Sequence, residues 1–148
     1  MAIEIERKFL VKGEFKQLAV GEMNITQAYL SVNPERIIRL RIYNDRAILA
    51  IKSNAKEAFA TRNEWEIEIP VTMAAEILEV CLPGTIDKTR YLVPYKGHTF
   101  EVDVFHGKRD GLIIAEIELN SENEVFEKPD WLGEEVTGNP AYYNSNLI

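Results

Sequence analysis

The sequence predicts a mainly β protein of the α+β class, with about eight antiparallel strands, enough to close a barrel, and two or three helices. Apolar and ionisable residues alternate through most of the 148 residues, which is typical of strands with one buried face. The connections are short and carry turn residues, which suits antiparallel neighbours. The length is that of a single domain, 1–148, with room for a core.

The predicted elements follow one another with little connecting chain. The best helix candidate is 71–81, which Pro83 and Gly84 close. A shorter helical piece is expected at 13–20, and another begins at Asn139–Pro140, where an N-cap residue precedes a proline. The polar segment 54–60 is expected to be a loop. The strands are predicted at 2–11, 24–32, 36–44, 46–53, 61–70, 85–94, 98–107 and 111–120.

Composition excludes several classes of protein. The net charge of −7 argues against nonspecific binding to nucleic acid or to an anionic membrane, since both need clustered positive charge. No apolar run approaches the roughly 20 residues of a membrane span. The single cysteine, Cys81, permits no internal disulfide. Because Glu4 and Glu6 stand where a secretory signal would be basic and then apolar, a cytoplasmic location is expected.

The first strand carries an unusual row of charges. In "EIERK", Glu4, Glu6 and Lys8 share one parity. Ile3, Ile5, Phe9 and Val11 share the other, which Arg7 interrupts. Side chains two apart on a strand project from the same face, about 7 Å from one to the next. The three charges are therefore expected to point together.

The same pattern recurs on nearly every strand, and same-sign charges come in pairs two residues apart. Such pairs repel on an ordinary surface. An antiparallel sheet with one wet side is the simpler interpretation, but a ligand of alternating sign, metal ions with phosphates, would turn the repulsion into attraction. The ionisable positions are Glu4, Glu6, Glu64, Glu66, Glu68, Glu101, Asp103, Glu116 and Glu118, with Lys8, Arg39, Arg41, Lys52, Arg62, Lys88 and Arg90.

If this face turned inward, the nine carboxylates and seven bases would leave a formal charge of −2. Such an interior repels a polyanion, and about two divalent cations would reverse its sign. The available ligands are hard carboxylate oxygens, which suit Mg²⁺ or Mn²⁺ better than zinc or copper. One or two such ions are therefore expected. Arginine would then supply forked donors to phosphate, and lysine a point charge.

Glu4-x-Glu6-x-Lys8 resembles the ExExK signature of the CYTH superfamily, the triphosphate tunnel metalloenzymes. The resemblance extends along the chain, since the segments that follow come in the order typical of short bacterial members: "QAYL", "RLR", "AIKS", "RNEWEIEI", "KTRY", "FEVDVF", "AEIEL" and "PDWLGEEVTG". It implies an eight-stranded antiparallel tunnel whose interior binds a triphosphate with divalent metal.

The resemblance also implies roles for individual residues. The metal ligands would be Glu4, Glu6, Glu116 and Glu118, with Glu64 and Glu66 serving a second ion or the attacking water. Catalysis would involve Glu4, Glu6, Lys8, Glu64 and Glu66. The phosphate ligands would be Lys8, Arg39, Arg41, Lys52, Lys88 and Arg90.

Metal-dependent hydrolysis of a small or inorganic triphosphate, tripolyphosphate first, is the expected activity. The alternatives are a class IV-type adenylate cyclase, a nucleoside or thiamine triphosphatase, and a module that binds polyphosphate or nucleotide without turnover. A lipocalin-like carrier would need the opposite parity inward. The oligomeric state stays open, with a homodimer among the options. His98, His106 and Cys81 are expected to serve turns or packing.

Overall fold

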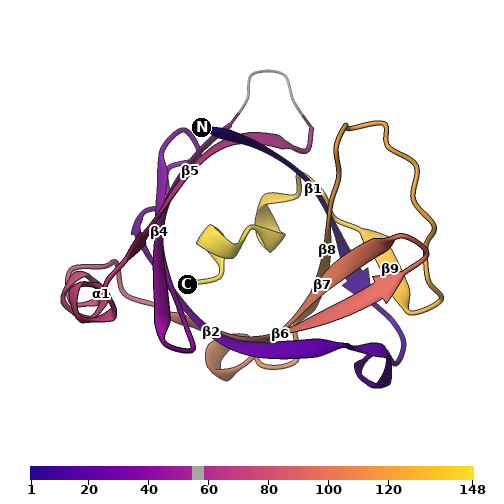
Figure 1. The fold of residues 1–148 in the computed structure, drawn as a ribbon, viewed down its shortest axis with the longest axis horizontal. Helices are drawn as coiled ribbons and strands as arrows, with labels where there is room; N and C mark the ends of the chain where they lie inside the picture. Colours follow the sequence, from indigo (N-terminus) through magenta and orange to yellow (C-terminus); the bar gives the residue numbers. More distant parts are fainter. Residues whose placement is uncertain (55–58) are drawn as a thin grey trace.

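The computed structural model of this chain describes residues 1–54 and 59–148. Residues 55–58, in the predicted loop 54–60, lie outside the described residues. Eight strands form a closed antiparallel barrel, to which one short strand and one α-helix are added (Figure 1). The strands are β1 (Ala2–Val11), β2 (Gly21–Ser31), β3 (Ile37–Tyr43), β4 (Arg46–Asn54), β5 (Thr61–Ile69), β6 (Ile86–Tyr95), β7 (His98–Phe105), β8 (Ile113–Glu118) and β9 (Leu132–Glu135).

The first strand closes the ring. Round the barrel the order is β5-β4-β3-β2-β6-β7-β8-β1, and the start of β1, at Ala2–Ile5, pairs back onto β5. The middle of β1 pairs with β8, so that Glu6 lies opposite Glu118 and Lys8 opposite Glu116. Three strands in all contact β1, because β9 pairs with its last residues across a register shift. The barrel therefore depends on a strand made at the very start of the chain.

The eight predicted strands are confirmed, with shifts of a few residues at their ends. The helix predicted at 71–81 is α1 (Val71–Leu78). The piece predicted at 13–20 is a single 3₁₀ turn, η1 (Lys16–Leu18). A second such turn, η2 (Gly107–Arg109), follows β7. The short strand β9 was not predicted, since its four residues offer too few alternations to be recognised.

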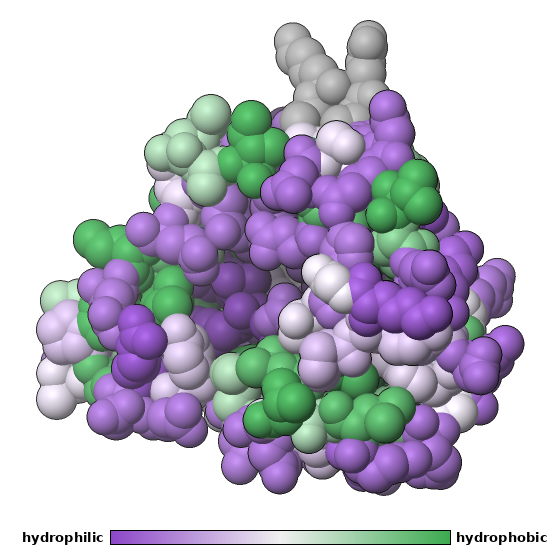
Figure 2. All heavy atoms as spheres, turned by 45° about the vertical axis from the view of Figure 1, so that its right-hand side comes forward, coloured by the Kyte–Doolittle hydropathy of each residue, from purple (hydrophilic) through white to green (hydrophobic). Residues whose placement is uncertain are grey.

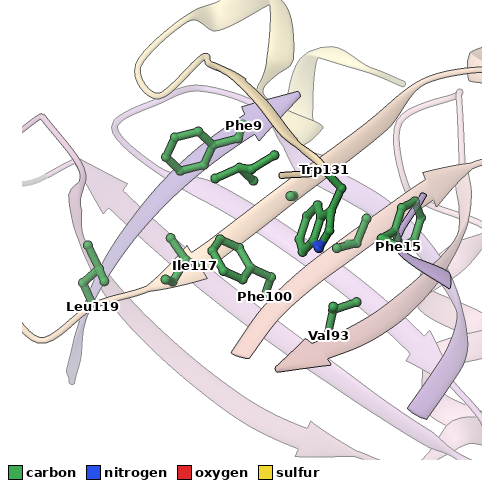
Figure 3. Packing of buried hydrophobic residues seen from close by; sticks show 10 residues of the cluster. Phe9, Phe15, Val93, Phe100, Ile117, Leu119 and Trp131 are labelled. Carbon is green, nitrogen blue, oxygen red and sulfur yellow. The ribbon is translucent and has the colours of Figure 1, made fainter. Parts of the chain in front are cut away.

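Apolar residues of one parity point outward from the barrel, where other segments of the protein cover them. Figure 3 shows Phe9, Phe100 and Trp131 packed together on the outside of β1, β7 and β8. The rings of Phe100 and Trp131 meet edge to face, with centroids 5.3 Å apart. On the far side of the ring, α1 packs Ala74 against Leu40 and neighbouring residues of β3 and β4. These two apolar clusters thus lie outside the barrel and leave much of its interior to polar groups.

Arg7, which interrupts the apolar parity of β1, is satisfied on the outside. Its Nε and Nη2 donate to the two carboxylate oxygens of Glu135 on β9, at 2.7 and 2.6 Å. The guanidinium carbon also lies 5.1 Å from the centroid of the Phe126 ring. This forked pair fastens β9 to β1.

The carboxyl-terminal segment turns into the barrel. The helix predicted from Asn139–Pro140 is instead two 3₁₀ turns, η3 (Pro140–Tyr142) and η4 (Asn144–Asn146). The Asn139 side chain does accept a hydrogen bond from the Ala141 amide, at 3.1 Å, as an N-cap residue. Figure 1 shows this segment, in yellow, inside the ring of strands.

Apolar contacts hold that segment in place at one end of the barrel. Leu147 is buried in a cluster on the inward parity, with Tyr142 and Ile148 packed against it. Gly84 has a φ of +102°, and a Cβ there would meet the carbonyl carbon of Ile148 at 2.6 Å, so only glycine suits this position. The buried partners of Leu147 are Tyr29, Ile37, Ile86, Phe105 and Ile114. One end of the interior is therefore filled by apolar side chains.

Replacing Leu147 by alanine should lower the free energy of unfolding by about 2 to 4 kcal/mol, because it leaves a cavity at the closed end of the barrel. Urea denaturation of the two proteins measures the difference. Val125→Ala, at a position 89% exposed, is the matched control and should leave the midpoint unchanged. Equal midpoints for both variants would show that the segment does not fill the barrel in solution.

Candidate active site: a charged cavity inside the barrel

A cavity of about 1100 Å³ occupies the barrel interior. Figure 2 shows a hollow in the molecular surface whose walls are strongly hydrophilic. Most of the ionisable residues predicted to face inward are brought together here. Those that line the cavity are Glu4, Glu6, Lys8, Arg39, Arg41, Lys52, Arg62, Glu64, Glu66, Arg90, Glu101, Glu116 and Glu118.

Carboxylates predominate on one side of the cavity and arginines on the other, although Lys8 of β1 and Arg62 of β5 project from the acidic side. We call the carboxylates of the adjacent strands β8, β1 and β5 the acidic wall: Glu4, Glu6, Glu64, Glu66, Glu116 and Glu118. We call the three arginines of β3 and β6, which flank β2, the basic wall: Arg39, Arg41 and Arg90. Since β1 and β2 stand on opposite sides of the ring, the two walls face each other.

A lysine joins two carboxyl groups of the acidic wall. Lys52 Nζ lies 3.0 Å from Glu4 Oε2 and 3.0 Å from Glu64 Oε2, and Arg62 Nη2 lies 3.1 Å from Glu4 Oε1. Burial opposes ionisation of Glu4, but Lys52, a hydrogen bond with Glu64 and Arg62 outweigh it and lower its pKa to about 2. Burial and the hydrogen bond with Glu4 raise the pKa of Glu64 to about 7, against the pull of Lys52. Two carboxyl groups thus share one ammonium.

A second pair of carboxyl groups, Glu6 and Glu116, is crowded, and its cations act mainly on Glu116, whose Oε1 lies 3.9 Å from Arg90 Nη2. Burial, Glu116 and Glu4 together raise the pKa of Glu6 well above its ordinary value. Burial opposes ionisation of Glu116 too, but its hydrogen bond with Glu6 and the charges of Lys8 and Arg90 lower its pKa well below the usual range. Burial and the charge of Glu4 raise the pKa of Glu118. The acidic wall therefore holds more carboxyl groups than its cations neutralise, which favours a bound cation.

Arg90 of the basic wall is bound by a fully buried carboxylate, that of Asp103. Its Nε and Nη2 donate to the two oxygens of Asp103, at 2.8 and 3.0 Å, and its Nη1 donates to Glu101 at 2.8 Å. Lys88 Nζ lies 2.8 Å from Asp103 Oδ2, and both side chains are fully buried. The remaining contact of Lys88 is with Asn144 Oδ1, at 3.0 Å. Lys88 and Asp103 thus lie behind the cavity wall rather than on it.

Three of the predicted positions therefore do not line the cavity: Lys88 and Asp103 are buried behind its wall, and Glu68 lies in solvent. Lys88, predicted to bind phosphate, is covered by the carboxyl-terminal segment. Burial lowers its pKa to about 7 in spite of Asp103. Glu68 continues the parity of Glu64 and Glu66, yet it does not line the cavity and instead accepts a hydrogen bond from Arg46, at 2.6 Å, in solvent.

The sequence did not identify the cavity residues of the carboxyl-terminal segment or of β2. The carboxyl-terminal segment forms part of the site, because the backbone carbonyl of Tyr142 accepts a hydrogen bond from Lys8, at 3.0 Å. Gln27 and Tyr29 of β2 line the cavity between the basic strands. They lie on the inward parity of β2, opposite Ala28, but as neutral side chains they did not stand out beside the charged pairs. The residues of the carboxyl-terminal segment at the cavity are Thr137, Gly138, Tyr143, Asn144, Ser145 and Asn146.

The acidic wall fits a divalent metal in its chemistry. Its ligands are all carboxylate oxygens, which Mg²⁺ and Mn²⁺ prefer, and a cation would relieve the crowding of Glu6 and Glu116. Over residues 1–54 and 59–148, no three such ligands already stand together at metal-binding separation. Lys52 and Arg62 engage Glu4 in this structure, so a metal would take over oxygens that these cations now hold.

The histidines and the cysteine lie elsewhere. His98 Nε2 is 2.6 Å from Glu124 Oε2, and His106 Nε2 is 2.8 Å from Thr89 Oγ1. Cys81 packs against the cluster beneath α1, and burial raises the pKa of its thiol. His98 begins β7 and His106 follows it, so both histidines lie at the ends of this strand, as the sequence indicates, and Cys81 is packed. Within the described part of the chain, no helix has the length and apolar character to cross a membrane.

The fold and cavity define a class of protein, the closed antiparallel barrel with a charged interior. The chain belongs to the CYTH family: the family model for the CYTH domain matches residues 2–145. An inorganic triphosphatase of Acetivibrio thermocellus is 47% identical over 150 residues, covering 100% of this chain and 94% of that protein. An inorganic triphosphatase of Nitrosomonas europaea is 37% identical over 152 residues, covering 97% of this chain and 95% of that protein.

Solved structures agree on the fold. The crystal structure of an inorganic triphosphatase superposes with a TM-score of 0.66 at 34% identity, covering 97% of this chain and 95% of that one. A protein from Pyrococcus horikoshii superposes with a TM-score of 0.62 at 18% identity, covering 81% of this chain and 80% of that one. The predicted barrel and the predicted family membership are both confirmed.

Asp103→Ala should lower the free energy of unfolding by about 3 to 5 kcal/mol, because it strands Lys88 and part of Arg90 as buried charges. Chemical denaturation measures this change. The control is Glu68→Ala, which removes a carboxylate from the solvent-exposed pair with Arg46 and should have a much smaller effect. Similar losses in the two variants would contradict the buried position of Asp103.

Proposed function

We propose that this CYTH protein is a metal-dependent triphosphate phosphohydrolase and that inorganic tripolyphosphate is its first substrate. One observation carries the proposal: an acidic wall and a basic wall face each other across a single cavity. A triphosphate with bound cations has the complementary arrangement, since its cations seek carboxylates and its oxygens seek guanidinium groups. The two relatives named inorganic triphosphatase, 47% and 37% identical, support the same substrate.

Ligand binding would exchange partners within the cavity. In the structure Lys52 and Arg62 neutralise Glu4. If Mg²⁺ or Mn²⁺ bound Glu4, Glu6, Glu116 and Glu118, Lys52 and Arg62 would become available to phosphoryl oxygens. Lys8, Arg39, Arg41 and Arg90 would complete the grip on the anion. Lys52 and Arg62 would thus pass from Glu4 to the substrate when the metal takes their place.

The chain's own residues would do most of the chemistry by position and charge. The metal, when bound, would neutralise phosphoryl oxygens and polarise the scissile bond. The basic wall would hold the chain of phosphates in line and stabilise charge as pyrophosphate departs. Glu64 and Glu66, beside the other acidic pairs, would hold a second ion or accept a proton from the attacking water. Burial inside the barrel would keep bulk water from competing for the phosphates.

Several finer expectations continue as proposals. Mg²⁺ or Mn²⁺ is favoured by the all-carboxylate donor set, and binding of nucleic acid is disfavoured by the net charge of −7. The assignment of 1–148 to one domain, a location in the cytoplasm and a homodimer remain predictions.

Purified protein with Mg²⁺ or Mn²⁺ should release phosphate from tripolyphosphate. Glu4→Gln or Glu118→Gln should reduce the rate by about 100-fold or more, because each removes charge that acts on the reacting phosphates through the metal. A colorimetric phosphate assay with tripolyphosphate, ATP and thiamine triphosphate measures the rates and ranks the substrates.

Glu68→Gln is the control for this experiment, since it makes the same chemical change on the same strand parity outside the cavity. It should retain the wild-type rate, and circular dichroism should show that all variants are folded. Undiminished turnover in Glu4→Gln and Glu118→Gln would remove these residues from the site. Cyclic AMP as the main product from ATP would replace hydrolysis by cyclase chemistry.

Millimolar Mg²⁺ should raise the melting temperature of the wild-type protein, because a ligand that binds only the folded state stabilises it by mass action. Scanning fluorimetry with and without EDTA measures the shift. The shift should disappear in the double variant Glu4→Gln, Glu118→Gln and persist in Glu68→Gln. A shift of equal size in all three proteins would place the ion outside the acidic wall.

A further inference from the structure

Gln27 on β2 is fully buried at the cavity wall and lies directly opposite Arg41 in the pairing of β2 with β3. Its side-chain oxygen Oε1 accepts two hydrogen bonds from that arginine, from Nε at 3.0 Å and from Nη2 at 2.9 Å. One edge of the guanidinium is thereby fixed. Nη1 and the second hydrogen of Nη2 are left for the cavity, since the group has five N–H donors in a planar fork.

The other cavity arginines are held by carboxylates. Arg90 is bound by Asp103 and Glu101, Arg62 by Glu4, and Arg39 Nη2 lies 3.7 Å from Glu66 Oε2. For Arg41, the described residues place no carboxylate oxygen within the 4.0 Å of an ion pair. Arg41 is thus held by two hydrogen bonds to an uncharged acceptor, whereas Arg90 is held by ionised ones.

A neutral anchor and an ionised anchor have different consequences for an anion. A carboxylate would fix the guanidinium and cancel its charge, whereas an amide oxygen fixes it and leaves the charge to act on the cavity. Burial, Arg39 and Arg90 lower the pKa of Arg41 to about 10, so it stays charged at neutral pH. Asp103 also acts on this charge from a distance, but an incoming anion could bind the guanidinium directly.

Arg41 determines which way the amide of Gln27 points, because a guanidinium only donates and therefore requires the amide oxygen. The NH₂ group is then turned the other way, where Nε2 donates to the Tyr29 hydroxyl at 2.6 Å. In the reverse orientation the NH₂ group would face the guanidinium, donor against donor. Tyr29 is itself buried and pairs across the sheet with Arg39. The orientation is therefore built into the fold.

We infer that Gln27 is a positioning residue of the anion site, which holds Arg41 in place while leaving its charge uncompensated for a phosphoryl group of the substrate. Gln27 acts through Arg41 and does not itself bind phosphate. The inference rests on the proposed function for the identity of the anion, and it adds a neutral residue to a site otherwise described by its charges.

The test is Gln27→Glu, which retains the shape and can accept both hydrogen bonds from Arg41. It replaces the NH₂ group by an oxygen to which the Tyr29 hydroxyl can donate, and it adds a negative charge. Titration calorimetry with pyrophosphate and Mg²⁺ measures affinity without requiring turnover. We expect the dissociation constant to rise about 10- to 100-fold, the range for a charged hydrogen bond to the anion, while the melting temperature of the free protein does not fall. Gln17→Glu makes the same change at an exposed position and should bind as the wild type.

Arg41→Met separates the inference from simple repulsion by the new charge. If Gln27 acts through Arg41, the effect of Gln27→Glu should shrink to less than half, on a logarithmic scale, in the Arg41→Met background. The same fold-change in both backgrounds would overturn the inference. So would wild-type affinity in Gln27→Glu alone.

Tyr29→Phe provides a second variant should Gln27→Glu fold poorly. It removes the acceptor of the Gln27 NH₂ group, so the amide is held less firmly beside Arg41. We expect weaker pyrophosphate binding, and wild-type affinity would again count against the inference. Tripolyphosphate hydrolysis by the wild type is measured separately. A wild-type protein that binds pyrophosphate but releases no phosphate would refute the proposed function, and the affinities of the variants would still decide the role of Gln27.

Discussion

The opposition of a carboxylate wall to an arginine wall, inside a closed barrel, is the constraint on which the rest of the structure depends. Charges of one sign crowded on neighbouring strands repel, and only their counterparts across the lumen and within the wall make the arrangement tolerable. Lys52 between Glu4 and Glu64 shows how closely this is balanced. Because much of the interior is polar, two of the three apolar clusters lie outside, where α1 and the segment around Trp131 cover the barrel, and the third fills one end of the interior.

Much of this could be read from the sequence, because a period of two reports directly which residues share a face. That pattern located all eight barrel strands, and thirteen of the sixteen inward ionisable positions line the cavity. The three positions that do not line the cavity show what the alternation pattern cannot predict. Glu68 has the right parity but lies beyond the lumen, and Lys88 and Asp103 are inward but covered. The alternation pattern predicts which side chains point inward, but it does not predict how far along the barrel the cavity extends.

The features that were missed have a common cause, since each depends on contacts between distant parts of the chain. The strand β9 is recognisable only by its pairing with β1 and by the forked pair from Arg7 to Glu135. The helix expected after Asn139 is two 3₁₀ turns, because the segment has to fit among Tyr29, Ile86 and Ile114 inside the barrel. Gln27 lacks charge, and its importance follows only from lying across from Arg41.

The position of the carboxyl-terminal segment has a consequence for how the molecule forms during synthesis. Lys8 donates a hydrogen bond to the carbonyl of Tyr142, 134 residues later in the sequence. The strand β1 pairs with β5, β8 and β9, which also follow much later. A nascent chain emerging from the ribosome therefore carries its first strand unpaired until the later strands are translated. Such long-range pairing slows folding, and the interior is complete only when residues 137–148 have been synthesised and lie within the barrel.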